Sequence, residues 1–342
     1  MKLSKTNLFI GIIITVSIVA AVAIILRTAM TTDRKTTIGN VFIYDIKEFS
    51  KTDPGLIKYK ETGKIKTGFQ NPFAIAIDSG DRIYVAGDKS IRILDAQGRI
   101  LSNIKLIESP RCLNIADDGS IYVGMKEHLE VYNSRGTRTA KWESLGQNAV
   151  ITAIAVSGND VFVADASGKI ILRYDKSGKL KTNIGKRNPD KGITGFIVPS
   201  PYFDVAIASD GLLWVVNPGL HKIEAYTYDG DLQASWGETS IEIKGFSGCC
   251  NPVNIAILPD GKFVTCEKGI PRVKIYSSNG NFESVVAGAE SFADTVGIYN
   301  PSAGAEDSTK ALDVAVNSKG RIFILDPVEK TIRVFWLTNR RT

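Results

Sequence analysis

The hydrophobic residues of most of this chain fall into short stretches, separated by polar turns that contain glycine. Short apolar stretches rich in Val, Ile, Tyr and Phe are typical of β-strands, and Asp-Gly, Asn-Gly and Ser-Gly turns between them indicate hairpins. One unit recurs along the chain. It has two apolar strands joined by a tight turn, then a third strand, a turn with glycine and a fourth strand. The pattern therefore predicts repeated four-stranded antiparallel sheets.

Six copies of this unit follow one another. The first turn of each copy falls at Asp81, Gly119, Asn159, Gly211, Gly261 and Gly320. Four-stranded units that recur about every 40 to 60 residues are typical of a β-propeller, in which radial repetition protects the sheet edges. We therefore predict an all-β fold, a six-bladed β-propeller, over residues 56–342. A β-sandwich is the alternative, but it does not explain six matched units.

The last copy has no fourth strand of its own, because only residues 338–342 follow its third strand. In the other copies the fourth strand begins after a glycine, and an apolar residue lies six positions later. Gly63 and Phe69, upstream of the first copy, have the same spacing. We therefore expect an N-terminal strand over Lys64–Phe69 to complete the last blade and close the ring. Such closure pairs backbone groups that an open edge would expose.

Several repeats carry a recognisable motif, Pro-x-x-(Ile/Val)-Ala followed by Asp-Gly, Val-Ala-Asp and Arg-(Ile/Val). Its residues here are Pro252-Val-Asn-Ile-Ala256, Asp260-Gly261, Val163-Ala-Asp165 and Arg272-Val-Lys-Ile-Tyr276. On these residues the chain, over about 63–337, resembles the NHL-repeat family of six-bladed propellers. Its stretches at 195–206, 212–219 and 245–269 resemble a membrane-linked or exported bacterial branch without an established activity. The resemblance implies the fold. It implies no single function, since the family includes binding modules and a few enzymes.

A different hydrophobic pattern occupies the N-terminus. Leu8–Leu26 has nineteen consecutive uncharged residues, and at 1.5 Å per residue a helix of this length spans about 28 Å, close to the hydrocarbon thickness of a bilayer. A cleaved signal peptide has a shorter apolar core and a small-residue cleavage site. We therefore predict a short basic tail at 1–7, an uncleaved transmembrane signal anchor at 8–26, and a linker at 27–55 in which Val41–Ile46 is a candidate extra strand. Cleavage and a buried helix are the alternatives.

The distribution of charge bears on topology and on partners. Lys2 and Lys5 precede the apolar segment, and short basic tails usually stay in the cytoplasm. We therefore expect the propeller on the other side of the membrane, in a bacterial periplasm or at the cell surface. The chain has a net charge of +6, of which residues 1–35 contribute +4 and the remainder +2. A nucleic-acid partner requires a basic stripe on the folded domain, so we predict none.

Polar residues on the innermost strands are the first candidates for chemistry, because these strands line a propeller's channel. Aligned first strands place six residues in one column: Ala74, Cys112, Ala153, Asp204, Asn254 and Asp313. Asn114 lies two places further along, in a column that otherwise holds alanine. We take Asp204, Asn254, Asp313, Cys112 and Asn114 as a candidate ligand-binding ring. We predict no cofactor, although the ring's oxygen atoms would suit calcium. The alternative is that these short side chains bond to backbone at the strand ends.

Cysteines offer a second candidate site, at Cys249, Cys250 and Cys266. An even number of cysteines outside the cytoplasm permits disulfides. Neighbouring cysteines rarely pair with each other because the ring is strained, and a bridge between Cys250 and Cys266 requires the loop at 248–252 to fold back. A disulfide, free thiols and a soft-metal site all stay open. The chain has no Cys-x-x-Cys spacing that would indicate a zinc site.

The function predicted from these observations is binding. Two long excursions, at 186–201 and 287–310, exceed ordinary turn length and favour contact with a protein partner. We predict a membrane-anchored extracytoplasmic propeller that acts as a protein- or ligand-binding scaffold without catalytic residues. One alternative is a calcium-assisted, lactonase-like hydrolase with its site in the channel, for which Glu267 is a candidate base. A second is a thiol or redox-linked protein that uses Cys249 and Cys250.

Overall fold

The computed structural model describes residues 19–23, 50–292 and 311–338. The chain divides into two units, Met1–Ile46 and Lys47–Thr342. In the first unit residues 19–23 are helical, and the remainder of the predicted anchor Leu8–Leu26 lies outside the described residues, as does the candidate strand Val41–Ile46. Within the part of the chain that is described, no helix has both the length and the apolar character that crossing a membrane requires.

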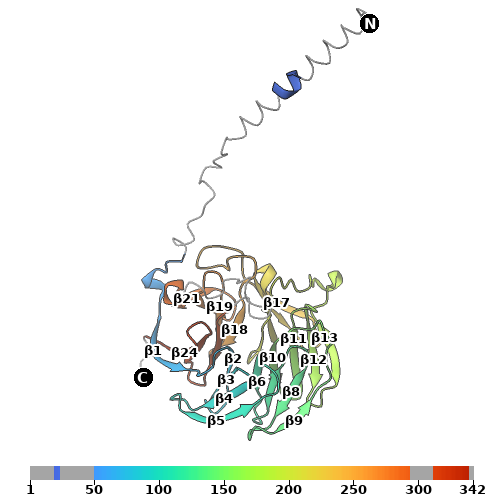
Figure 1. The fold of residues 1–342 in the computed structure, drawn as a ribbon, viewed down its shortest axis with the longest axis vertical. Coiled ribbons are helices and arrows are strands. Elements are labelled where there is room, and N and C mark those ends of the chain that lie inside the picture. Colours follow the sequence, from blue (N-terminus) through green and yellow to red (C-terminus); the bar gives the residue numbers. More distant parts are fainter. Residues whose placement is uncertain (1–18, 24–49, 293–310, 339–342) are drawn as a thin grey trace, which may run out of the picture. The chain divides into compact units, whose positions relative to one another are not determined.

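The second unit consists of six four-stranded antiparallel sheets, arranged as blades around a common centre (Figure 1). Blade 1 is formed by β2 (Pro72–Ile77), β3 (Ile83–Gly87), β4 (Ser90–Leu94) and β5 (Ile100–Lys105). Blade 2 is formed by β6 (Cys112–Ile115), β7 (Ile121–Gly124), β8 (Leu129–Tyr132) and β9 (Arg138–Lys141). Blade 3 is formed by β10 (Ile151–Ser157), β11 (Asp160–Asp165), β12 (Ile170–Asp175) and β13 (Leu180–Ile184). The order given runs from the innermost strand to the outermost.

The remaining blades follow the same order. Blade 4 is formed by β14 (Val205–Ile207), β15 (Leu213–Asn217), β16 (Lys222–Tyr226) and β17 (Leu232–Trp236). Blade 5 is formed by β18 (Asn254–Ile257), β19 (Phe263–Cys266), β20 (Val273–Tyr276) and β21 (Phe282–Ala287). Blade 6 is formed by β22 (Asp313–Val316), β23 (Ile322–Asp326), β24 (Thr331–Leu337) and β1 (Tyr59–Lys66). The prediction of a six-bladed propeller is confirmed.

Short 3-10 helices lie between the strands: η2 (Pro54–Leu56), η3 (Pro189–Lys191), η4 (Pro218–Leu220) and η5 (Ala289–Ser291). Each of the first three contains a proline near its start, where the missing N–H leaves no hydrogen bond unmade. These turns belong to the connections outside the sheets, so the described part of the second unit is built from strands.

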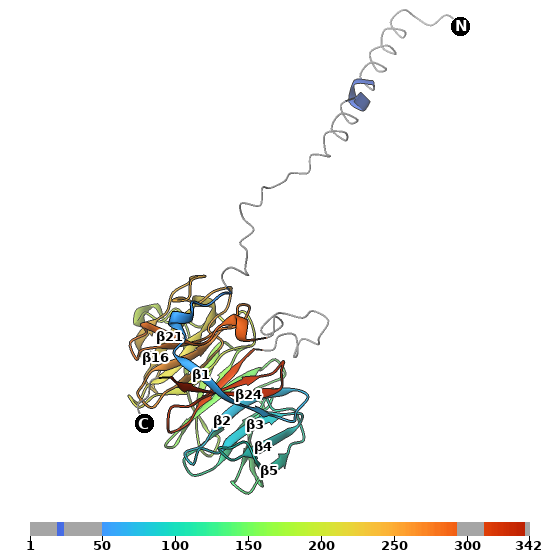
Figure 2. The same ribbon diagram turned by 90° about the vertical axis from the view of Figure 1, so that its left-hand side faces the viewer.

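The ring closes through the N-terminal strand, as predicted. β1 pairs antiparallel with β24 over its length, from Tyr59 opposite Leu337 to Lys66 opposite Thr331. Figure 2 shows the two strands side by side, although they come from opposite ends of the sequence. Glu61 of β1 adds an ion pair to Arg333 of β24, at 2.5 Å. The outer edge of the last blade is therefore covered.

The expected position of this strand was wrong by several residues. In other blades the apolar residue of the outer strand packs against the turn glycine of the next blade, as Trp142 does on Gly178. Ile65 of β1 packs in the same way on Gly98 of blade 1. Ile65 is therefore the counterpart of these residues, whereas Phe69 lies beyond the end of β1. A spacing counted from one glycine missed this, because the contact that matters is made with the following blade.

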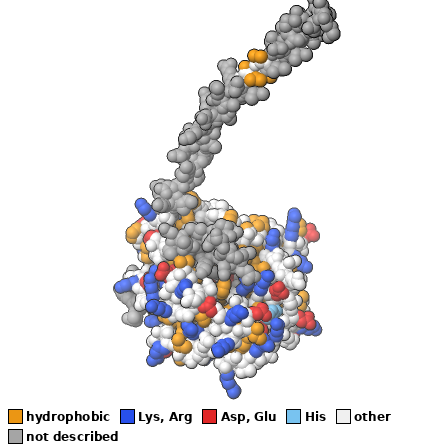
Figure 3. Space-filling model, viewed as in Figure 1, with side chains coloured by type: hydrophobic (Ala, Val, Ile, Leu, Met, Phe, Trp, Pro, Cys, Tyr) orange, Lys and Arg blue, Asp and Glu red, His pale blue; other side chains and the backbone are white. Residues whose placement is uncertain are grey.

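The hydrophobic core lies between successive blades. The second strands are buried along their whole length in β3, β7, β15, β19 and β23. Outer strands such as β5 are mostly exposed. Only Ile104, near the end of β5, is buried, where it packs on Gly136 of the next blade. On the face drawn in Figure 3, basic and acidic side chains are interspersed. Packing between the apolar faces of neighbouring blades holds the blades in place around the axis. The innermost strands therefore surround a space at the centre of the ring.

Candidate functional site

A cavity of about 440 Å³ lies at the centre of the ring, lined by the innermost strands of all six blades. These strands are β2, β6, β10, β14, β18 and β22, and each lies next to the innermost strands of both neighbouring blades. A volume of this size falls in the range of small-molecule binding sites. The cavity is therefore the main candidate for a functional site in the part of the chain that the structure describes.

The two ends of the cavity differ in polarity. The innermost strands all run in the same direction, so their first residues meet at one end and their last residues at the other. Asp204, Asn254, Asp313 and Thr152 lie at the first end. The other end is lined by one β-branched residue from every blade: Ile77, Ile115, Val156, Ile207, Ile257 and Val316. Alanines such as Ala76 and Ala206 line the wall between them. The carboxylates of the lining therefore lie toward one end, which apolar residues such as Phe73 and Phe203 also line, whereas the other end carries only the β-branched ring.

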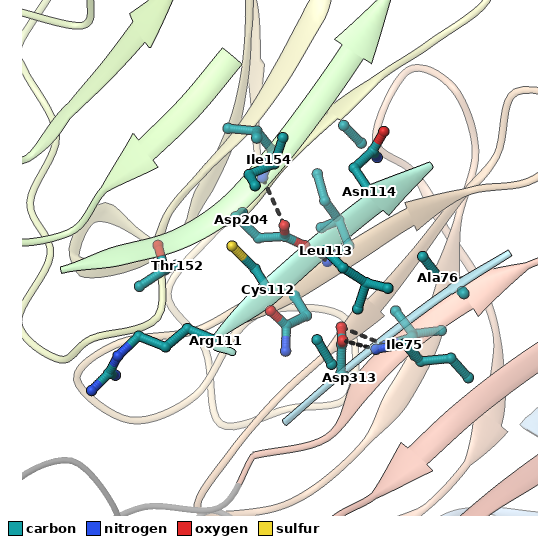
Figure 4. A pocket seen from close by; sticks show the side chains of 18 of the residues that line it. Ile75, Ala76, Arg111, Cys112, Leu113, Asn114, Thr152, Ile154, Asp204 and Asp313 are labelled. Carbon is teal, nitrogen blue, oxygen red and sulfur yellow. Dashed lines mark hydrogen bonds between the residues drawn. The ribbon is translucent and has the colours of Figure 1, made fainter. Parts of the chain in front are cut away.

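The structure brings the whole predicted ring together. Asp204, Asn254, Asp313, Cys112 and Asn114 all line the cavity. Figure 4 shows Asp204, Asp313, Cys112 and Asn114 from close by, with the Arg111 side chain extending away from the two carboxylates. The alignment of the repeats therefore located these residues in space. Their bonding, rather than their position, decides what they do.

Both carboxylates in the ring accept hydrogen bonds from backbone. Asp204 Oδ2 accepts the N–H of Ile255, on the next blade, at 2.7 Å, and Oδ1 accepts the N–H of Val205 at 2.8 Å. Asp313 Oδ2 accepts the N–H of Ile75, again on the next blade, at 2.9 Å, and Oδ1 accepts the N–H of Val314 at 2.8 Å. Each carboxylate therefore joins its own blade to the following one by hydrogen bonds.

Two neutral side chains make the corresponding contact elsewhere in the ring. Asn254 Nδ2 donates to the carbonyl oxygen of Leu312 at 2.6 Å, joining blade 5 to blade 6. Thr152 Oγ1 donates to the carbonyl oxygen of Phe203 at 2.6 Å, joining blade 3 to blade 4. Four successive blade junctions thus carry a side-chain to backbone bond at the same level. This is the bonding to strand-end backbone that the sequence left open as the alternative to a ligand-binding ring.

Burial in the cavity wall shifts the acidity of both carboxyl groups. Burial, reinforced by the charge of Asp313, raises the pKa of Asp204 to about 8, although two backbone N–H groups oppose the shift. Burial raises the pKa of Asp313 to about 6, against the same kind of opposition. At neutral pH the pair therefore carries close to one negative charge, on Asp313, while Asp204 is mostly protonated.

Cys112 is a packing residue in this wall. Its side chain is 5% exposed, and its sulfur lies so close to Gly124 that a Cβ there would approach it to 2.4 Å. Burial, together with the nearby charges of Asp204 and Asp313, raises the pKa of this thiol. Since the thiolate is the reactive form, Cys112 is suited to filling space between blades.

The donor set of the ring fits a structural role better than a calcium site. Calcium binds six to eight oxygen ligands, whereas every carboxylate oxygen of Asp204 and Asp313 already accepts a backbone N–H. In the described ranges, no three His, Cys, Asp or Glu side chains are grouped so as to hold a metal ion. The two carboxylates supply four oxygen atoms, fewer than the six to eight that calcium binds, and each of the four also accepts a backbone N–H.

Blade 5 contains a buried cluster of charged side chains that the sequence did not predict. Glu267, the candidate base, does not line the cavity. It is fully buried and forms ion pairs with Arg272 at 2.9 Å and Lys274 at 2.8 Å. Lys274 also donates to the carbonyl oxygen of Gly245 at 2.6 Å, in the loop above. The alternation Arg-Val-Lys in the sequence was the available signal, since it puts both cations on one face of a strand.

The remaining cysteines lie outside the cavity, and all four cysteines of the chain are free. Cys266 is fully buried in β19, opposite Asn254 of β18. Cys249 is exposed and Cys250 is buried, and their sulfur atoms are 3.1 Å apart. The structure therefore places the neighbouring pair together as thiols and leaves Cys266 apart from them.

The excursion at 186–201 is partly folded into the core. Ile193, Phe196 and Val198 are buried, and the Phe196 ring contacts that of Phe203 at 4.9 Å between centroids. Ile197, between two of these, stays 46% exposed. Residues 293–310 of the second excursion lie outside the described residues. Three residues therefore anchor the first excursion in the core, while most of its remaining residues are exposed.

Comparison with known proteins establishes the fold alone. No family model and no curated protein sequence matches the chain. Among solved structures, a streptogramin B lyase is similar with a TM-score of 0.54 and 14% identity, over 82% of this chain and 98% of its own. A protein of unknown function from Bacteroides thetaiotaomicron has a TM-score of 0.56 and 15% identity, over 81% and 71%.

One further solved structure carries a functional detail of its own. It is a catalytically inactive histidine-to-alanine variant of virginiamycin B lyase from Staphylococcus aureus with quinupristin, similar at a TM-score of 0.55 and 13% identity, over 82% of this chain and 99% of its own. In the present chain His128 and His221 are both buried, and neither lines the cavity. The likeness between the two proteins extends to the fold.

Proposed function

We propose that this protein is a binding module that holds a small molecule with one apolar and one polar end in its central cavity, without catalysing a reaction. The observation that carries this proposal is the polarity of the lining, which changes along the axis from the ring with Asp204 and Asp313 to the six β-branched residues. Sites for small molecules are usually apolar with a few polar groups that fix orientation. A ligand with matching ends would lie along the axis.

The charge at the polar end restricts the ligand further. With Asp313 ionised above about pH 6, an anionic head group would meet a like charge in a site of low dielectric constant. A hydroxyl or ammonium group would instead find carboxylate and amide oxygens, which retain acceptor capacity beyond their backbone bonds. The ligand class is therefore neutral or cationic at its polar end.

Catalysis has less support from the same residues. The carboxylates at the channel are engaged by backbone, and the histidines lie elsewhere. The similarity to lyases is compatible with an enzyme, but at 13 to 14% identity it extends to the fold only. A calcium-assisted hydrolase at the channel is therefore the rival hypothesis, and it predicts that calcium and both carboxylates are needed together.

The cellular setting is also part of the proposal. Membership of the NHL-repeat family rests on the motif residues of the repeats, and anchoring through Leu8–Leu26 rests on the uncharged apolar run. On this view the propeller lies outside the cytoplasm, in the periplasm or at the cell surface. The excursions at 186–201 and 287–310 are then the surfaces through which a protein partner would bind.

Calorimetric titration of the full-length, detergent-solubilised chain with octanol, octylammonium and octyl sulfate at pH 7.5 tests the cavity. Octanol and octylammonium are expected to bind with one molecule per chain, and octyl sulfate at least about tenfold more weakly. Ala76→Phe, which fills the wall of the cavity, should abolish binding. Ala96→Phe makes the same change at an exposed turn and should leave it intact. Equal binding by both variants would refute the cavity as the site.

The rival hypothesis needs its own arm. Hydrolysis of ester and lactone probes is measured with calcium and with a calcium chelator, for the unmodified chain and for Asp204→Asn and Asp313→Asn. We expect no calcium-dependent hydrolysis above background. A rate that falls in both variants and with the chelator would overturn the binding proposal in favour of the enzyme.

A further inference from the structure

We infer that Cys249 and Cys250 form a redox-active pair of thiols, which exchanges with an external disulfide and closes to a disulfide between the two neighbouring residues. The site lies outside the cavity, and the inference does not depend on the proposed function. It rests on how the loop presents the two sulfur atoms, on the frame that holds the loop, and on the groups beside Cys250.

The loop turns both thiols to the same side. Side chains of neighbouring residues in an extended chain point to opposite faces, but here the Cys249 and Cys250 sulfur atoms approach to 3.1 Å. Cys249 is exposed, whereas Cys250 is 3% exposed. A dissolved reagent can therefore reach the Cys249 sulfur, and the buried Cys250 sulfur lies in contact with it.

A network of buried hydrogen bonds fixes this loop from below. The N–H of Ser247 donates to Glu267 Oε2 at 3.1 Å. Asn251 Nδ2 donates to the carbonyl oxygens of Ser247 and Lys268, at 2.6 and 2.9 Å. His221 Nε2 bonds with the carbonyl oxygen of Gly248 at 2.8 Å. Since contacts flank the pair on both sides, the approach of the sulfur atoms is held by the fold.

The environment favours ionisation of the inner thiol. Burial acts to raise the pKa of Cys250, but Ser200, Cys249 and Lys268 outweigh it and bring that pKa below its ordinary value. Cys250 in turn raises the pKa of Cys249 through the hydrogen bond between the two sulfur atoms. The Lys268 Nζ atom also lies 5.5 Å from the centroid of the Tyr202 ring, and Tyr202 lines the cavity. The inner thiol therefore loses its proton more readily than an ordinary cysteine, and the thiolate is the form that attacks.

The chemistry is two successive thiol–disulfide exchanges. The Cys249 sulfur loses its proton and attacks one sulfur of the external disulfide, which breaks that bond and expels one thiolate to take up the proton. The Cys250 thiolate then attacks the Cys249 sulfur in the mixed disulfide, forms the bond between the neighbours and expels the second thiolate. Two electrons pass from the protein to the external disulfide, and two small thiols leave.

The oxidised form is expected to be easily reduced. Neighbouring Cα atoms lie about 3.8 Å apart, less than the separation of about 4.4 to 6.8 Å usual across a disulfide, and strained disulfides are the labile ones. Cys112 and Cys266 are buried, and burial raises the pKa of each. Exchange should therefore be confined to the neighbouring pair.

Mass spectrometry of the reduced full-length chain after treatment with oxidised glutathione tests the inference. Alkylation after unfolding should find two thiols consumed, at Cys249 and Cys250, with no glutathione retained. Cys250→Ser should stop at the first step and retain one glutathione on Cys249, and Cys250→Ala should do the same. Cys249→Ser should not react. Cys266→Ala is the matched control and should close its pair like the unmodified chain.

Two results would overturn the inference. One is a stable glutathione adduct on Cys249 in the unmodified chain, since it would mean that Cys250 does not attack. The other is recovery of all four alkylatable thiols after treatment. Lys268→Met tests the electrostatic effect of Lys268 through the pH dependence of disulfide closure, which a change in packing alone would not shift. It should shift the pH dependence of closure upward, because the cation that lowers the pKa of Cys250 is gone.

Discussion

The Asp313 carboxylate accepts the backbone N–H of Ile75 at 2.9 Å, and this bond joins the innermost strand of the last blade to that of the first. At the outside of the same blade, β1 pairs with β24. The seam of the ring is therefore held at two radii, by a side chain near the axis and by a strand at the rim. Each closure can be removed without touching the other.

Asp313→Ala should lower the free energy of unfolding by about 1 to 3 kcal/mol, because the N–H of Ile75 loses its buried acceptor. The measurement is urea denaturation at pH 4, close to the unfolded pKa of about 3.9 and well below the folded pKa of about 6, where ionisation of the carboxyl contributes only about 0.5 kcal/mol. Asp117→Ala removes an exposed carboxylate and should change stability by less than about 0.5 kcal/mol. Equal effects of the two substitutions would contradict a stabilising hydrogen bond at Asp313.

The pH dependence of stability should report Asp204. Its pKa is about 8 in the folded chain and about 3.9 when unfolded, so between these values the unfolded chain binds fewer protons. The contribution of this group is therefore fully present below about pH 4 and is lost as the pH rises toward 8. Each unit of difference corresponds to about 1.4 kcal/mol. Asp204→Asn should flatten the decline in unfolding free energy measured from pH 5 to 8.

Titrating groups other than Asp313 contribute equally to both proteins in that comparison, so the difference between the two curves reports Asp204 together with its coupling to Asp313. The same substitution at the exposed Asp117 provides a control, and its curve should run parallel to that of the unmodified chain. Parallel curves for Asp204→Asn as well would show that the carboxyl has an ordinary pKa in the folded state.

The repeats predicted the architecture and the location of the cavity residues, because both follow from strand spacing. Asp204, Asn254 and Asp313 fell in one column of the alignment, and all three line the cavity. Their backbone partners could not be predicted, since each partner lies on another blade. Ile65 was missed in favour of Phe69 for the same reason, because its contact is with Gly98 of blade 1.

Features that depend on irregular loops were the least predictable. Spacing alone left the state of Cys249 and Cys250 open, because the direction of a side chain in a loop follows no period. The cluster of Glu267, Arg272 and Lys274 was also missed, since isolated charges in a strand usually indicate an exposed face. Here a loop covers them, and Tyr276 completes the contact by donating to the carbonyl oxygen of Lys244 at 2.9 Å.

Packing between blades through a turn glycine gives a sharper stability test. Gly280 has φ of 84°, and a Cβ there would lie 2.3 Å from Trp236 Cγ. Gly211 has φ of 78°, but nothing lies within 4 Å of its Cβ position. Gly211→Ala should cost about 1 to 2 kcal/mol for the left-handed backbone alone. Gly280→Ala should cost a further 1 to 3 kcal/mol, roughly, from overpacking.

Thermal and urea denaturation of both variants measure this difference. A second substitution, Trp236→Leu, shortens the side chain that Gly280 faces and should recover part of the additional loss in a double variant. If Gly280→Ala and Gly211→Ala lower the free energy of unfolding equally, the added Cβ at Gly280 is accommodated without cost. The contact between Gly280 and Trp236 would then not set the spacing of the blades.

The strand at the rim should be required for a stable monomer. A chain that begins at Lys47 keeps β1 and should unfold cooperatively at the same temperature as the full chain, whereas one that begins at Thr67 exposes the edge of β24. Loss of burial at Tyr59 and Ile65 should cost at least about 3 kcal/mol. The unpaired edge should also promote self-association. Denaturation and size-exclusion chromatography over a range of concentrations measure both effects. A shortened chain that remains a monomer of unchanged stability would show that blade 6 closes without β1.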